Sequence, residues 1–89
     1  MNETVKIVVT GKVQGVWFRR YTQNKAQELG ISGTVQNLND GSVLIIATGT
    51  DTQLTQLTAW CKRGSPKAIV QSVNIHKIPT NEFKKFSIL

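Results

Sequence analysis

Apolar and polar residues follow two different periods in the first third of the chain. Across residues 5–10, apolar residues take every second position, which is the period of a strand with one buried side. Across residues 18–29 the period is helical, and Gly30 follows as a C-terminal stop. The predicted buried stripe of this helix consists of Phe18, Thr22, Ala26 and Leu29.

A hairpin is predicted after this helix. Residues 34–37 start a second strand, and Asn39-Asp40-Gly41 is a strong hairpin-turn signal. Residues 42–48 then form a third strand.

A second helix follows the hairpin. Either Thr50 or Asp51 caps its N-terminus, and Gly64-Ser65-Pro66 ends it. The apolar stripe of this helix consists of Leu54, Leu57 and Cys61.

Two further strand patterns complete the chain. Residues 69–78 predict a long fourth strand, and residues 83–88 predict a short edge strand with Phe86 and Ile88 facing inward. The order β-α-β-β-α-β predicts an α+β fold of the ferredoxin-like type, an antiparallel sheet with two helices on one face. Enzymes, RNA-binding modules and small-molecule sensors share this fold, so the fold alone does not select a function.

Composition narrows the class of protein. The 89 residues are expected to form one domain, residues 1–89. Cys61 is the only cysteine, which excludes an internal disulfide and a Cys-rich zinc site. The apolar run at residues 43–47 is far too short to cross a membrane, and residues 1–4 lack the features of a secretory signal. We therefore expect a cytoplasmic protein with no membrane partner, and we expect a monomer.

Basic residues outnumber acidic ones. Eleven Lys and Arg against five Asp and Glu give a formal net charge of +6. Such a charge attracts anions of every kind, from small phosphates to nucleic acids. The charge therefore supports an anionic partner without identifying it.

The segment between the first strand and the first helix has the chemistry of a phosphate site. Gly11 and Gly15 bracket a tight turn, and Arg19 stands on the first turn of the helix. Such a turn points successive backbone N–H groups into one concavity, and an arginine beside it can bind an anion through two parallel N–H bonds. The spacing fits neither a Walker A loop nor a dinucleotide-binding loop. A simple turn with an exposed arginine stays open as the alternative.

Two motifs carry a resemblance to the acylphosphatase family. Residues 11–19 (GKVQGVWFR) resemble its first signature, G-x-V-Q-G-V-x-F-R, at every specified position. The second signature has an aromatic residue where this chain has Thr34. Its other specified positions are matched at the required spacing by Gly33, Val35, Asn37, Gly41, Val43 and Gly49.

The resemblance implies hydrolysis of acyl phosphates to a carboxylate and inorganic phosphate, with no metal and no organic cofactor. By matching positions, it implies that the side chain of Arg19 holds the phosphate and that Asn37 orients the attacking water. It also implies a backbone cradle formed by the amides of Gln14, Gly15, Val16, Trp17, Phe18 and Arg19. The anhydride has a good leaving group, so positioning and charge stabilisation matter more than a strong base. The acceptor of the water's proton stays open, the bound phosphate being one candidate.

Several other side chains are assigned structural roles. His76, the only histidine, is expected to face solvent, and Cys61 is expected in the core. Asp51 is interpreted as a helix cap and Asp40 as a turn residue. Carboxylates with the spacing of a metal site are absent from the sequence.

The two tryptophans differ in their predicted roles. Trp60 is expected in the core or at a helix edge. Trp17 lies within the phosphate-site segment, and two interpretations stay open: a place at the rim of the pocket, or ordinary packing.

Two non-catalytic functions compete with hydrolysis. A basic ferredoxin-like module could bind RNA, but the third strand carries no aromatic residue on which bases would stack. An inactive module could sense a phosphorylated metabolite, but the intact Arg19 and Asn37 argue against lost activity. We therefore expect an enzyme whose partners are an acyl phosphate and inorganic phosphate, with no specific nucleic acid.

Overall fold

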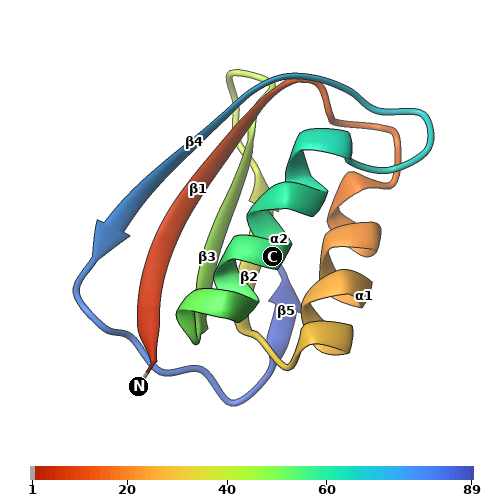
Figure 1. The fold of residues 1–89 in the computed structure, drawn as a ribbon. Helices are drawn as coiled ribbons and strands as arrows, with labels where there is room; N and C mark the ends of the chain where they lie inside the picture. Colours follow the sequence, from red (N-terminus) through yellow and green to blue (C-terminus); the bar gives the residue numbers. More distant parts are fainter. Residues whose placement is uncertain (1) are drawn as a thin grey trace.

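Two helices cover one face of a five-stranded sheet, in the order that the sequence predicts (Figure 1). The computed structural model describes residues 2–89. The elements are β1 (Glu3–Lys12), α1 (Phe18–Leu29), β2 (Ser32–Asn37), β3 (Val43–Gly49), α2 (Asp51–Arg63), β4 (Ile69–Ile78) and β5 (Phe86–Ile88). The α+β class and the ferredoxin-like order are thus confirmed.

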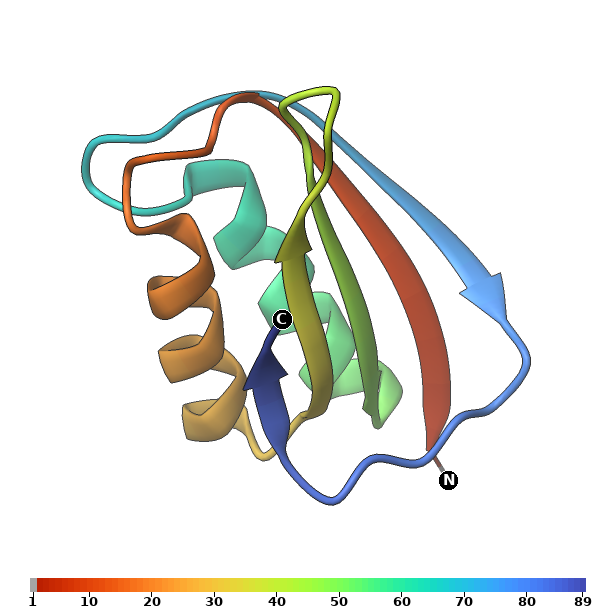
Figure 2. The same cartoon turned by 180° about the vertical axis from the view of Figure 1, so that it is seen from behind.

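The sheet is mixed, which corrects the predicted all-antiparallel sheet. Its strand order is β4-β1-β3-β2-β5, and the four longer strands pair antiparallel. The short β5 pairs parallel with β2. Figure 2 shows the reason: the chain leaves β4 at one edge, runs past the end of the sheet and enters the opposite edge in the direction of β2.

β1 is longer than its apolar pattern, whereas β5 is shorter than the predicted residues 83–88. β1 begins at Glu3 and extends to Lys12, and its pairing with β4 shifts register at Gly11. A side chain at Gly11 would place its Cβ 2.2 Å from the carbonyl oxygen of Ile69. Glycine at this position therefore lets β4 pass close to β1 at the start of the phosphate-site segment.

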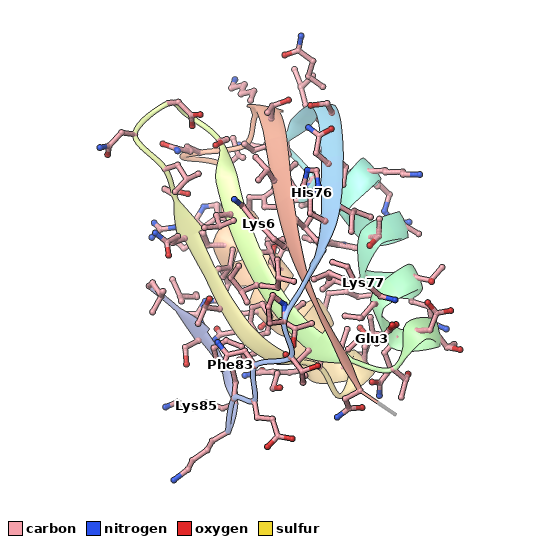
Figure 3. All side chains as sticks on the ribbon, turned by 90° about the vertical axis from the view of Figure 1, so that its left-hand side faces the viewer. Glu3, Lys6, His76, Lys77, Phe83 and Lys85 are labelled. Carbon is pink, nitrogen blue, oxygen red and sulfur yellow. The ribbon has the colours of Figure 1, made fainter. Side chains whose placement is uncertain are left out.

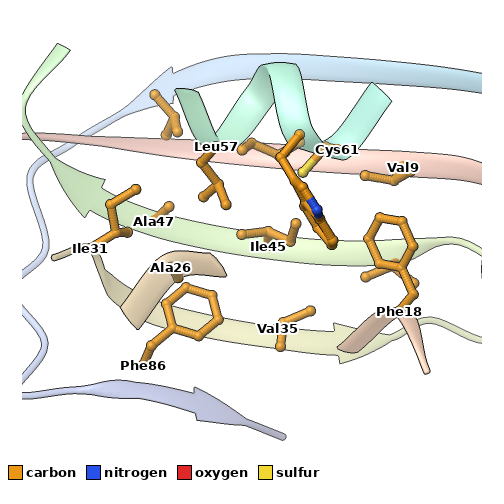
Figure 4. Packing of buried hydrophobic residues seen from close by; sticks show 14 of the residues in the cluster. Val9, Phe18, Ala26, Ile31, Val35, Ile45, Ala47, Leu57, Cys61 and Phe86 are labelled. Atoms are coloured by element: carbon orange, nitrogen blue, oxygen red, sulfur yellow. The ribbon is translucent and has the colours of Figure 1, made fainter. Parts of the chain in front are cut away.

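One hydrophobic cluster lies between the sheet and the helices (Figure 4). The buried positions of α1 are Phe18, Thr22 and Ala26, whereas Leu29, the fourth residue of the predicted stripe, is only partly buried against the cluster. The ring of Phe18 packs against that of Trp60 on α2, with 5.4 Å between the ring centroids. This contact confirms Trp60 as a core residue, and it fixes the first residue of α1 against α2.

The two helices begin in different ways. Thr50 caps α2, and Gln53 completes a capping box by accepting from the N–H of Thr50. Asp51 is the first residue of the helix, so its interpretation as a cap is wrong. α1 has no side-chain cap.

The other face of the sheet carries no helix (Figure 3). His76 on β4 lies beside Lys6 on β1 in the antiparallel register, and both are exposed. The prediction that His76 faces solvent is therefore confirmed. Thr34 alternates with the buried Val35 and so lies on this uncovered face, where the family signature has an aromatic residue.

Candidate active site

The N-terminus of α1 is free to bind an anion. Trp17 occupies the N-cap position, makes no side-chain capping bond, and is followed by a first turn without an acidic residue. The first N–H groups of a helix have no partner inside the helix, and the helix dipole adds positive potential at this end. The lack of a side-chain cap therefore leaves donors and positive potential available to a ligand.

Two left-handed residues shape the loop that leads into α1. Gly15 has a φ of 73°, a conformation that glycine adopts without a Cβ clash, and Trp17 has a φ of 65°. Left-handed residues between right-handed ones turn successive N–H groups into one concavity. Among residues 2–89, no protein acceptor is recorded for any backbone N–H of residues 14–19. These N–H groups are therefore unpaired donors.

A hydrogen bond from the segment between α2 and β4 holds this loop in place. The hydroxyl of Ser65 donates to the carbonyl oxygen of Val16 at 2.8 Å, and Ser65 is buried. In a trans peptide the C=O and N–H groups point in opposite directions. The bond from Ser65 therefore directs the N–H of Trp17 away from the core.

Gln14 joins the same loop to the β2–β3 hairpin. Its side-chain Nε2 donates to the carbonyl oxygens of Leu38 at 2.8 Å and Ser42 at 2.9 Å. These two residues flank the turn that follows Asn37. Sequence reasoning assigned only the backbone of Gln14 to the site and missed its side chain.

Arg19 and Asn37 line the same cleft of about 390 Å³. The structure thus brings together the two side chains that the sequence singles out. Asn37 is half-buried, and its Oδ1 is fully buried with no hydrogen-bond partner within residues 2–89. A buried polar atom normally has a partner, so this oxygen is an exception, and turning the amide toward the cleft would expose it to a ligand or water. The complete lining is Val13, Gly15, Trp17, Phe18, Arg19, Arg20, Asn37 and Ile88.

The predicted cradle residues have different positions around the cleft. Gly15, Trp17, Phe18 and Arg19 line it. The side chain of Val16 is buried, and that of Gln14 extends to the hairpin. The side chains of these last two residues therefore support the loop.

The guanidinium of Arg19 donates a hydrogen bond to Leu89. Its Nη1 donates to the backbone oxygen of Leu89 at 3.3 Å, in an exposed position. The N–H of Leu89 in turn donates to the carbonyl oxygen of Val35 on β2. A long, exposed hydrogen bond is weak, so an anion in the cleft can take this donor from Leu89.

Neither the thiol of Cys61 nor a metal-binding group of side chains lies in the cleft, within residues 2–89. Cys61 is buried among core residues on α2, and burial raises the pKa of its thiol to about 12. It is therefore a core thiol, as predicted. Within residues 2–89, His, Cys, Asp and Glu side chains do not gather in any group of three that could hold a metal ion. In the same range, neither helix is long and apolar enough to span a membrane.

The chain is similar to known proteins over most of its length. The acylphosphatase family model matches residues 5–88. An acylphosphatase of Methylococcus capsulatus is 43% identical over 86 residues, which are 96% of this chain and 94% of that protein. One of Marinobacter nauticus is 47% identical over 81 residues, 90% of this chain and 88% of that protein.

A solved acylphosphatase structure has the same fold as this chain. The structure of an acylphosphatase from Coxiella burnetii has a TM-score of 0.96 with this chain at 36% identity. The match covers 99% of this chain and 93% of that protein.

Proposed function

Since this chain belongs to the acylphosphatase family and is an acylphosphatase, we propose that the cleft between α1 and β2 is where it hydrolyses acyl phosphates. The proposal assigns the phosphate to the backbone of residues 14–19 and to Arg19. It assigns the attacking water to Asn37. The products are a carboxylate and inorganic phosphate.

The phosphate end of the substrate finds matching donors in the cleft. The N–H groups of residues 14–19 have no protein acceptor in the described part of the chain, and α1 adds the positive end of its dipole. Arg19 supplies a planar pair of N–H donors once it leaves Leu89. Both sets of donors stabilise the charge on the three phosphoryl oxygens as the reaction proceeds.

Asn37 has the chemistry to orient water. Its side chain lines the cleft, and once the amide turns its Oδ1 out of the buried position, this oxygen accepts a hydrogen bond from the water while the amide nitrogen donates toward a phosphate oxygen. The water oxygen attacks phosphorus in line while the bond from phosphorus to the acyl oxygen breaks. The carboxylate leaves with the electron pair of that bond, and a phosphate oxygen takes the water's proton.

The single observation that carries the proposal is the position of the Asn37 Oδ1. It has no hydrogen-bond partner within residues 2–89, and its residue lines the same cleft as Arg19 and the uncapped start of α1. An acceptor beside an anion site fits a water-dependent attack on a bound phosphoryl group.

The experiment is release of phosphate from benzoyl phosphate in the presence of excess EDTA. We expect full activity, with competitive inhibition by inorganic phosphate. Arg63→Ala is the matched control, because Arg63 ends α2 and does not line the cleft. It should leave activity unchanged, whereas Arg19→Ala should not. Reversible loss of activity on chelation, or purely noncompetitive inhibition by phosphate, contradicts the proposed site.

The alternative, a non-catalytic module for RNA or a phosphorylated metabolite, has no specific observation in its favour. On the uncovered face, Leu44 and Ile46 are the outward residues of β3, and neither offers an aromatic surface to a base. The assay above separates the alternatives, because neither non-catalytic module releases phosphate. Metal independence, a cytoplasmic location and a monomeric state stay predictions.

A further inference from the structure

Trp17 combines exposure with an unfavourable backbone conformation. Its φ is 65°, which is uncommon for a bulky residue, and 72% of its surface is exposed. The residue therefore does not contribute to the core, and it does not cap α1. A strained, exposed aromatic residue at the edge of a site indicates a functional role for its side chain.

The cleft that Trp17 lines has a polar part and an apolar part. The polar part is formed by Arg19, Asn37 and the free N–H groups of the loop. The apolar part includes the exposed Trp17 at the start of α1, and the partly buried Ile88 lies on the other side, on β5 beside β2. Such a division fits a ligand with an anionic end and an apolar end.

We propose that Trp17 forms a subsite for the acyl group and selects substrates with aromatic or other bulky apolar acyl groups. This inference rests on the function proposed above. In-line attack places the leaving acyl group on the side of phosphorus opposite to the water. Asn37 on β2 holds the water, so the acyl group is directed away from β2, and Trp17 precedes α1 on the other side of the cleft.

The indole ring suits this role physically. It offers a large apolar face, and an aryl ring packs on such a face in an offset stack or edge to face. The phosphate donors are the same for every acyl phosphate, so they do not distinguish one acyl group from another. Apolar contact at Trp17 would supply that difference.

The test compares benzoyl phosphate with acetyl phosphate in three variants. Trp17→Asn removes the ring and keeps a residue that tolerates the left-handed backbone. Trp17→Phe keeps an aromatic face. Tyr21→Ala is the matched control, because Tyr21 is also an exposed aromatic residue near the start of α1 but lines a different groove, beside Trp60.

A loss of activity confined to benzoyl phosphate would support the acyl subsite at Trp17. In Trp17→Asn, kcat/KM for benzoyl phosphate should fall about five- to tenfold, the size of one aromatic contact, while that for acetyl phosphate changes less than about twofold. Trp17→Phe should retain most of the preference, and Tyr21→Ala should change neither substrate. An equal loss for both substrates, or no loss, overturns the subsite and leaves the proposed hydrolysis intact.

Binding provides a readout that does not depend on turnover. Isothermal titration calorimetry should give a lower Kd for benzylphosphonate than for methylphosphonate, and Trp17→Asn should abolish this difference. The same affinity for both phosphonates in the unmodified protein overturns the subsite. Failure to hydrolyse either acyl phosphate overturns the proposed function instead, and the phosphonate comparison then still decides whether Trp17 binds apolar groups.

Discussion

The hydroxyl of Ser65 donates a 2.8 Å hydrogen bond to the carbonyl oxygen of Val16, although the two residues are 49 positions apart. The bond connects the segment after α2 to the middle of the proposed phosphate cradle. Ser65 and the side chain of Val16 are both buried, so the bond is shielded from water. The position of the cradle therefore depends on a residue outside it.

Ser65→Ala should weaken phosphate binding as well as stability. The substitution leaves the Val16 carbonyl without this donor, which should lower the free energy of unfolding by about 1–3 kcal/mol. The released peptide should also misorient the N–H of Trp17, and phosphate affinity should fall about tenfold. Chemical denaturation and phosphate titration measure the two effects. Thr58→Ala is the control, because Thr58 makes a similar bond to Leu54 on α2, outside the cleft. Equal phosphate affinity in both variants would show that Ser65 only stabilises the fold.

Gln14→Met should affect turnover more than phosphate binding. Methionine has a similar shape but cannot donate to Leu38 and Ser42, so the hairpin that carries Asn37 loses its connection to the loop. We expect turnover of benzoyl phosphate to fall about tenfold and phosphate affinity to change less than about threefold. Steady-state kinetics and phosphate titration check this split. A loss of phosphate affinity larger than the loss of turnover would contradict the connecting role.

Cys61 should make stability depend on pH above neutrality. Burial raises the pKa of its thiol from 9.0 to about 12 in the folded protein. The unfolded protein releases this proton at lower pH, so stability is fully present below about pH 9 and is lost as the pH rises from there toward 12. The slope of this contribution approaches about 1.4 kcal/mol per pH unit.

Cys61→Ala isolates this contribution. Between pH 9 and pH 10.5, the unmodified protein should lose about 1–2 kcal/mol more unfolding free energy than the variant. At pH 7 the variant should be about 1 kcal/mol less stable and should turn over at a nearly unchanged rate. Denaturation curves at the three pH values provide the measurement. A hundredfold fall in turnover of the folded variant would make Cys61 part of the chemistry.

Local chemistry in the sequence predicts much of this structure. Gly11 and Gly15 were expected to bracket a tight turn, and both adopt a positive φ there. The spacing Thr50-x-x-Gln53 is itself a capping-box signal, which would have decided between Thr50 and Asp51 as the cap. Phe18 and Cys61 are buried because helical spacing places them on the apolar stripes. These features depend on neighbours within a few positions.

Other features depend on contacts that local patterns do not encode. β5 has three residues, too few to show a period or to indicate its parallel partner. A left-handed tryptophan contradicts the ordinary preference of bulky residues, so the conformation of Trp17 was not predicted. The partners of Ser65 and Gln14 lie far along the chain. The two motifs led to Arg19 and Asn37, but the side chains that hold the surrounding backbone emerge only from the fold.

The different roles proposed for Arg19 and Asn37 predict different effects on phosphate binding and on turnover. Arg19 should contact phosphate in the bound substrate and in the transition state, so Arg19→Ala should weaken phosphate binding and turnover together. Arg19→Lys should restore little, because an ammonium cannot reproduce the planar pair of donors. Asn37 should contact mainly the attacking water. Each variant must first be shown to be folded by circular dichroism and cooperative unfolding.

The most direct measurement is therefore made on folded Asn37→Ala: turnover at saturating benzoyl phosphate, together with the affinity for inorganic phosphate. We predict a loss of turnover of about a hundredfold or more, the size expected for one preorganised hydrogen-bonding group, with phosphate affinity close to that of the unmodified protein. Normal turnover at saturation combined with abolished phosphate binding would contradict the assignment of the water to Asn37.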